Sequence, residues 1–119
     1  PSAALEAVQP FAEVMKSSVW LLLLLTGIVA AVTEEFIFRG YLSRVLEATG
    51  LGLWGGALVS ALIWAGMHVY YPLSAQLSLV AVGVALSIVR ARTGSLYPGM
   101  AWHILNNTVA LLALRVIGG

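Results

Sequence analysis

The stretch VWLLLLLTGIVAAVTEEFIFRGYL, residues 19–42, sets three ionisable side chains directly after an apolar run. The whole chain is 61% hydrophobic and 9% charged, whereas an ordinary soluble domain is roughly 45–50% apolar and about 25% charged. Its mean hydropathy is +0.97, and a chain of 119 residues is too small to bury so much apolar surface within itself. We therefore expect an integral, multi-pass membrane protein, located in the plasma membrane if its source is prokaryotic.

The apolar residues fall into four stretches, each close to the ~20 residues that cross about 30 Å of hydrocarbon. The first runs from about residue 11 through the charged residues into an amphipathic extension that stops near Gly50, and the others cover about 53–71, 73–89 and 96–117. Continuous apolar runs without alternation favour helices over a β-barrel. The sequence thus predicts an all-α, polytopic transmembrane helical bundle of about four membrane helices plus the extension. We expect a single domain over residues 1–119, with its motifs at about 30–112, that is complete or a piece of a longer protein.

Small and basic residues predict how this bundle is packed and oriented. Glycine, alanine and serine recur in the second and third stretches, where they let helix backbones approach closely. Arg39, Arg44, Arg90 and Arg92 lie near the first and third connections, while Lys16 and Arg115 lie toward the other side. The positive-inside rule therefore predicts that the first and third connections are cytoplasmic.

Two absences in the sequence narrow the classes of function. The chain has no cysteine, which excludes disulfides, thiolate metal sites and a cysteine nucleophile. It has no basic tract of the kind that follows a nucleic-acid backbone. We expect a lipid bilayer as a partner and no nucleic acid.

Polar side chains at membrane depth are costly, so they indicate a functional site by default. Glu35 and Arg39 are four residues apart, which favours an ion pair within one helix, whereas Glu34 points about 100° away from Glu35. His103 and Asn107 are also four apart and share a helix face, and His68 lies near the end of the second stretch. The spacing predicts that Glu34 is left to meet groups from other helices in one pocket.

This set of residues suits the hydrolysis of an amide bond. A carboxylate can act as a general base that deprotonates water, and a histidine can hold or polarise that water. A histidine together with an asparagine amide can donate hydrogen bonds to a carbonyl oxygen as it becomes an oxyanion. We therefore predict a hydrolase.

Three short motifs in this order carry a resemblance to a known family. EEFIFRG at 34–40 fits EExxxR, WAGMH at 64–68 is similar to FxxxH with tryptophan where phenylalanine is common, and HILNN at 103–107 fits HxxxN. Together, on successive apolar stretches, they resemble the CPBP family, which comprises the CAAX proteases and bacteriocin-processing enzymes and is also called the Abi family. The resemblance covers about residues 30–112, most of the chain.

The resemblance implies an intramembrane glutamate protease similar to the core of the type II CAAX prenyl protease. Glu34 would activate the water, His68 would help to orient it, and His103 with Asn107 would form the oxyanion site. Glu35 and Arg39 would be a structural pair that supports the site. The implied substrate is a membrane-associated protein or peptide, prenylated in some members, that is cut near its C-terminus, and no cofactor is expected. Bacterial members are linked to bacteriocin maturation, self-immunity or peptide-signal processing.

Three alternatives remain open from the residues alone. Glu34, His68 and His103 could bind zinc as in a metalloendopeptidase, although the HExxH spacing is missing. A non-catalytic bacteriocin-immunity or peptide-binding membrane protein could keep the same residues for binding. A small transporter could use the glutamate and the histidines as a proton relay.

Overall fold

The computed structural model describes residues 9–10, 13 and 16–118, and all the regular structure in these residues is helical. The expectation of an all-α bundle is confirmed. A single continuous helix, Val19–Glu47, carries the EExxxR motif, and we call it the motif helix. It is built from α2 (Val19–Leu22), η1 (Leu23–Val29), α3 (Ala30–Glu34), η2 (Glu35–Leu42) and α4 (Ser43–Glu47).

The motif helix begins after an N-cap residue. The side chain of Ser18 accepts a hydrogen bond from the backbone N–H of Leu21 at 3.2 Å, and serine is a preferred N-cap. The sequence predicted a start near residue 11, which lies outside the described residues. Within the described part, the motif helix runs from Val19 through the charged residues to Glu47, as expected for a helix with an extension.

Two stretches of the motif helix, η1 and η2, are π-helical and flank Glu34. In each, the residue that follows the stretch donates its N–H to the carbonyl five residues earlier, Ala30 to Leu25 and Ser43 to Phe38. Short π-helical segments inside α-helices are often found at functional sites. The sequence predicted an ordinary helix here, because the apolar pattern does not distinguish the two forms.

The other helices are α5 (Gly52–Gly66), α6 (Leu73–Thr93) and α7 (Tyr97–Gly118). Helix α6 ends at Gly94, whose φ of 68° is left-handed and whose N–H donates to the carbonyl of Arg90. This is a common way to end a helix, and basic residues in the last turn suit the helix dipole. For these reasons α6 continues to Thr93, beyond the expected end near residue 89.

Helix α5 is shorter than the sequence predicted. It has 15 residues, which at 1.5 Å per residue is about 22 Å, whereas the second stretch was expected to continue to residue 71. The backbone N–H of Met67 is shared between the carbonyls of Ile63 and Trp64, and that of His68 bonds to Ala65. The chain thus tightens into a turn that takes His68 off the end of the helix. The other three helices are long and apolar enough to cross a membrane.

Close packing of α5 depends on small residues, as the sequence predicted. A Cβ added at Gly83 of α6 would lie 2.8 Å from the Cβ of Ala61 on α5. A Cβ at Gly56 of α5 would lie 2.7 Å from the backbone nitrogen of Glu47. Glycine at these two positions therefore lets α5 approach both α6 and the motif helix.

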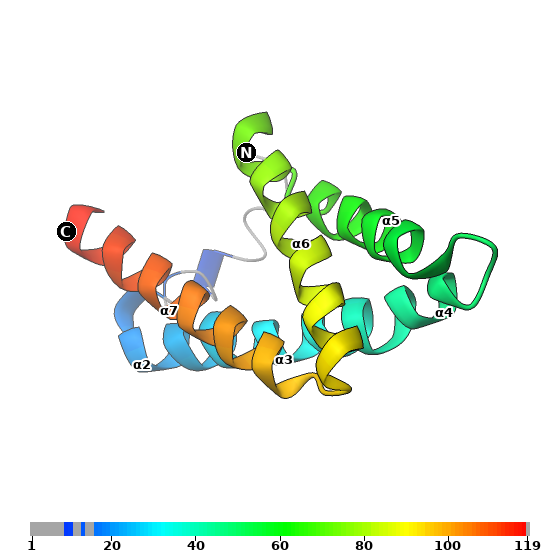
Figure 1. Cartoon of the computed structure of the whole chain (residues 1–119). Helices are drawn as coiled ribbons and strands as arrows, with labels where there is room; N and C mark the ends of the chain where they lie inside the picture. Colours follow the sequence, from blue (N-terminus) through cyan, green and yellow to red (C-terminus); the bar gives the residue numbers. More distant parts are fainter. Residues whose placement is uncertain (1–8, 11–12, 14–15, 119) are drawn as a thin grey trace.

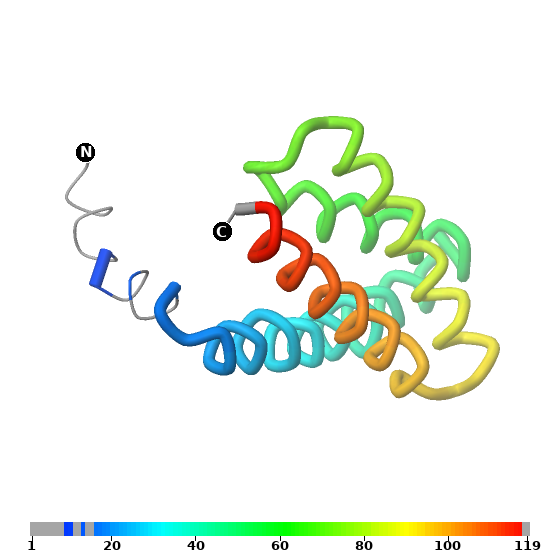
Figure 2. Tube along the Cα trace, turned by 90° about the vertical axis from the view of Figure 1, so that its left-hand side faces the viewer, coloured from blue at the N-terminus to red at the C-terminus, as the bar shows by residue number. Residues whose placement is uncertain are grey.

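Helices α6 and α7 diverge from the turn that joins them in the view of Figure 1, whereas in the view turned by 90° they run in roughly the same direction (Figure 2). Helix α7 crosses the motif helix, while α6 packs against α5. The buried apolar core is small and lies where these helices meet, and it includes Ala31, Phe38, Trp64 and Leu86. Many large apolar side chains are exposed on the outer faces, as expected for helices in contact with lipid.

Candidate active site

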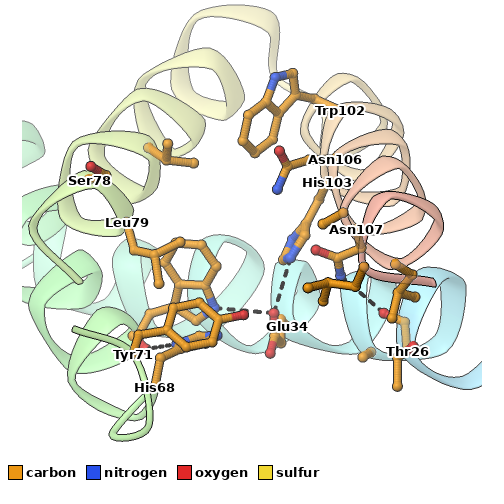
Figure 3. Close-up of a pocket in the computed structure, with 16 residues that line it drawn as sticks. Thr26, Glu34, His68, Tyr71, Ser78, Leu79, Trp102, His103, Asn106 and Asn107 are labelled. Atoms are coloured by element: carbon orange, nitrogen blue, oxygen red, sulfur yellow. Dashed lines mark hydrogen bonds and ion pairs between the residues drawn. The ribbon is translucent and has the colours of Figure 1, made fainter. Parts of the chain in front are cut away.

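A cavity of about 510 Å³ lies among the motif helix, α5, α6 and α7. Glu34, His68, His103 and Asn107, the residues for which the sequence predicted a common pocket, all line it (Figure 3). The rest of its wall is mostly apolar or aromatic. It includes Tyr71 after α5, Leu79 and Val82 from α6, and Trp102, Leu111 and Leu114 from α7.

Glu34 ends α3, and one of its carboxylate oxygens receives two contacts. The indole N–H of Trp64 donates to Oε2 at 3.2 Å, and Nε2 of His103 lies 3.1 Å from the same oxygen. None of the described contacts involves Oε1. The side chain keeps 30% of its surface exposed, so Glu34 is held from one side and accessible from the cavity.

His103 bridges the two adjacent glutamates. Its Nδ1 lies 2.8 Å from Oε1 of Glu35, while its Nε2 faces Glu34. A neutral imidazole carries one N–H, so both contacts are hydrogen bonds only if the cluster holds one further proton, on the ring or on a carboxyl group. The sequence predicted that Glu35 pairs with Arg39, and the contact with His103 is an addition to that prediction.

The ion pair between Glu35 and Arg39 is present and almost fully buried. Their charged atoms lie 3.2 Å apart, and each side chain is 1% exposed. With the extra proton, the charges of Glu34, Glu35, His103 and Arg39 sum to zero. A neutral cluster of this kind is needed at membrane depth, where an uncompensated charge is expensive.

Trp64 lies at the centre of the cluster and was not predicted to bind Glu34. The guanidinium carbon of Arg39 is 4.2 Å from the centre of its ring. The rings of His68 and His103 approach it edge-on, at 5.3 and 5.6 Å between centroids. Tryptophan adds an N–H donor where the FxxxH motif has phenylalanine, so this departure from the motif was the sign in the sequence of a contact with Glu34.

His68 is positioned by the turn after α5. Its Nδ1 donates to the carbonyl of Trp64 at 2.8 Å, and because a carbonyl only accepts, the proton is on Nδ1. Nε2 of a neutral His68 is then a hydrogen-bond acceptor. The backbone carbonyl of His68 accepts from Nε2–H of Gln76 at 2.8 Å, which ties this turn to α6.

Asn107 joins α7 to the π-helical stretch η1. Its Nδ2 donates to the backbone carbonyl of Thr26 at 3.1 Å, as Figure 3 shows. An amide nitrogen carries two hydrogens, so one remains for another acceptor. Asn107 lines the same cavity as Glu34, and its hydrogen bond to the motif helix fixes the position of its amide.

Close approach of α7 to the motif helix brings His103 to the glutamates. A Cβ at Gly99 would lie 3.2 Å from Oε2 of Glu35, and a Cβ at Gly27 would lie 3.3 Å from Oγ1 of Thr108. The glycines therefore leave room on both helices. Pro98 and Gly99 precede His103 by about one turn, but their role could not be read from the HxxxN motif alone.

The zinc alternative required Glu34, His68 and His103 as ligands. Among the described residues, no three His, Cys, Asp or Glu side chains are grouped so that they could hold a metal ion. Both ring nitrogens of His103 face carboxylates. The zinc alternative stays a prediction that an experiment has to test.

Comparisons with known proteins agree with the motifs. Residues 16–109 match the family described as type II CAAX prenyl endopeptidase Rce1-like. The chain is also 33% identical over 104 residues to an Escherichia coli protein described as an uncharacterized 24.3 kDa protein. That alignment covers 86% of this chain and 48% of the relative, so the chain spans about half the relative's length. No solved structure matches the chain. On the extent of the family match, this integral membrane protein belongs to the type II CAAX prenyl endopeptidase Rce1-like family.

Proposed function

We propose that this chain is an intramembrane endopeptidase that hydrolyses a peptide bond near the C-terminus of a membrane-associated protein or peptide. The observation that carries the proposal is the accessible carboxylate of Glu34 in a cavity that His68, His103 and Asn107 also line. Membership of an endopeptidase family supports it. The roles of the individual residues are part of the proposal.

The first step is the activation of a water molecule between Glu34 and His68. The further proton of the cluster is on His103 or Glu35, which leaves Glu34 ionised and Nε2 of His103 a donor. One O–H of the water donates to the Glu34 carboxylate, and the other donates to Nε2 of His68, whose Nδ1 proton is engaged with the carbonyl of Trp64. Holding both hydrogens directs a lone pair of the water oxygen at the scissile carbonyl. Glu34 takes the first proton as the C–O bond forms.

The second step is stabilisation of the oxyanion that forms on the carbonyl oxygen. Asn107 has one amide hydrogen that is not used by Thr26. His103 supplies the other donor, because protonation of Glu34 weakens the contact between that carboxyl and Nε2 of His103. Donors fixed by the protein before the reaction stabilise such an oxyanion most effectively.

Collapse of the tetrahedral intermediate completes the reaction. The carbonyl re-forms, the C–N bond breaks, and the proton held by Glu34 moves to the leaving amine nitrogen. The water has then added OH to the acyl group and H to the amine. No metal takes part in the proposed steps.

The apolar wall of the cavity supports a membrane-associated substrate. Leu79 and Val82 on α6 face a space that is also lined by Leu111 and Leu114 on α7, and these two helices diverge from their common turn. A peptide with an apolar or lipidated end can lie between them without exposing that end to water. The family's name points to a prenyl group as the lipid, and this is part of the proposal.

The decisive variant is Glu34→Gln, which keeps the size of the side chain and removes the base. We expect the rate of peptide cleavage in lipid nanodiscs to fall by about 10²- to 10⁴-fold, with little change in unfolding temperature. Glu13→Gln is the matched control, because Glu13 is exposed and pairs only with Lys16 among the described contacts. Cleavage by Glu34→Gln at the wild-type rate would contradict the mechanism.

Two further measurements separate the alternatives. A chelator is expected to leave the cleavage rate unchanged, whereas a loss that zinc alone restores would favour a metalloendopeptidase. Mass spectrometry of C-terminal peptides, prenylated and unmodified, is expected to detect two product fragments. Tight peptide binding without fragments would favour the peptide-binding alternative, and pH-linked flux in liposomes without fragments would favour the transporter.

A further inference from the structure

A second cavity, of about 300 Å³, lies away from Glu34 on the other side of the motif helix's charged stretch. Gly40 and Arg44 of the motif helix line one wall, and Arg90 at the end of α6 lines another. The turn between α6 and α7 closes it, because Leu96 packs against the motif helix at Gly40, where a Cβ would lie 3.0 Å from its side chain. Its volume is at the small end of the range for ligand pockets, about 300–1,000 Å³.

The lining of this cavity carries an excess of positive charge. Arg90 forms an ion pair with Glu47, but Arg44 forms none within residues 9–10, 13 and 16–118. Nε of Arg90 is buried and has no hydrogen-bond acceptor among the described residues. A buried N–H without an acceptor costs about 1–3 kcal/mol. The cavity lining therefore includes one guanidinium, that of Arg44, without an ion pair among the described residues.

The cavity lies where apolar helices end, which is the depth of lipid headgroups. Helix α6 ends at Thr93 and α7 begins at Tyr97, so the turn that closes the cavity is at a membrane boundary. Tyr41, which lines the cavity, is 68% exposed, and Phe36 beside it is 57% exposed. Aromatic residues are typical of this interface, and basic pockets between membrane helices bind anionic headgroups.

We propose that this cavity binds the phosphate group of an anionic membrane phospholipid. Arg44, which is exposed and lines the cavity, contacts the phosphate oxygens, Arg90 on the opposite wall adds positive charge, and the acyl chains lie along the exposed face of the motif helix beside Phe36. Guanidinium groups suit phosphate because their N–H donors match its oxygens. The lipid is favoured over a soluble phosphate because the cavity adjoins an exposed aromatic face.

The test measures lipid binding by native mass spectrometry in a neutral detergent, which removes the surface charge of a bilayer. Phosphatidylglycerol and phosphatidylcholine are titrated separately into the wild-type chain, Arg44→Gln and Arg92→Gln. Arg92 is the matched control, because it is exposed near the end of the same helix as Arg90 but does not line the cavity. A parallel titration adds inorganic phosphate to the complex with phosphatidylglycerol.

We expect the wild-type chain to prefer phosphatidylglycerol, Arg44→Gln to bind it about tenfold more weakly, and Arg92→Gln to bind it like the wild type. Arg44→Lys, which keeps the charge, is expected to fall between Arg44→Gln and the wild type. Equal loss in Arg92→Gln would overturn the proposal in favour of general surface charge. Equal binding of both lipids by the wild type would also overturn it, as would displacement of the lipid by millimolar phosphate, which would assign the site to a free anion.

Discussion

The motif helix takes part in two charged clusters that differ in whether a carboxylate remains accessible. The first, which we call the acidic cluster, comprises Glu34, Glu35, Arg39 and His103. The second, which we call the polar clamp, comprises Ser43, Glu47, Ser87 and Arg90. In the clamp, Ser43 donates to Glu47 at 2.8 Å, Arg90 pairs with the same oxygen, and the hydroxyl oxygens of Ser43 and Ser87 lie 3.2 Å apart.

The two clusters differ in which carboxylates are enclosed and which is accessible. In the polar clamp, Glu47 is 15% exposed and its charge joins the motif helix to α6. In the acidic cluster, Glu35 has the equivalent structural role toward Arg39 and His103, at 1% exposure. Of the three carboxylates, Glu34 is the most exposed, at 30%, and it is the one that lines the large cavity. We therefore expect activity to depend on Glu34, and stability to depend on the carboxylates that are enclosed.

The largest expected effect on stability is that of Arg39→Met. Methionine fills much of the same space but leaves the acidic cluster with an uncompensated negative charge, which costs about 3–5 kcal/mol when one partner of a buried pair is removed. Thermal unfolding in detergent measures the loss. Because total stability is only about 5–15 kcal/mol, we expect a large fall in the unfolding temperature.

A second change tests the reason for that loss. Glu35→Gln in the Arg39→Met background removes one negative charge and is expected to recover part of the stability. A double variant that is no more stable than Arg39→Met would mean that the loss of stability comes from packing, including the contact with the Trp64 ring, and not from the uncompensated charge.

The next effect is on catalysis and concerns a neutral residue of the large cavity. Asn107→Ala removes the proposed oxyanion donor, so we expect kcat to fall by about 10²- to 10³-fold with KM little changed. Thr108→Ala is the control, because Thr108 is the next residue on α7 but does not line the cavity. A raised KM with unchanged kcat would show that Asn107 binds substrate without acting on the oxyanion.

In the polar clamp, Glu47→Gln is expected to lower stability and leave cleavage unchanged, whereas Glu34→Gln is expected to lower cleavage and leave stability unchanged. The ion pair with Arg90 is lost, at a cost of about 1–3 kcal/mol for donors left without a full partner, while cleavage per folded molecule stays at the wild-type level. The unfolding temperature measures the change in stability, and kcat, determined on the same preparation, measures the change in activity. If Glu47→Gln lowers kcat as strongly as Glu34→Gln, the two clusters are not separate in function.

Much of the fold follows from residues that can be recognised without a structure. Apolar length predicted the motif helix, α6 and α7, and small residues at Gly56 and Gly83 predicted the close packing of α5. The spacing of four residues predicted the pair of Glu35 with Arg39. Each of these depends on local sequence, where helical periodicity fixes which side chains are neighbours.

What could not be predicted depends on contacts between distant helices or on the backbone. The π-helical stretches depend on tertiary packing, and their carbonyls at Thr26 and Phe38 accept from Asn107 and Ser60 on neighbouring helices. The early end of α5 depends on how the turn at His68 bonds to Trp64 and Gln76. The second contact of His103, with Glu35, requires the exact crossing of α7, which no spacing along the chain specifies.

The smallest expected effect is that of Trp64→Phe, which restores the aromatic residue that is common in the family. The ring over Arg39 is kept, but the N–H that holds Oε2 of Glu34 is lost. Because this bond is long and is one of two on that oxygen, we expect the low end of the range for bonds to charged groups, about tenfold in kcat. Trp64→Leu, which also removes the cation–π contact, is expected to be less stable than Trp64→Phe. If kcat is unchanged in Trp64→Phe but stability falls in Trp64→Leu, Trp64 supports Arg39 alone, and Glu34 is positioned by His103 without the indole.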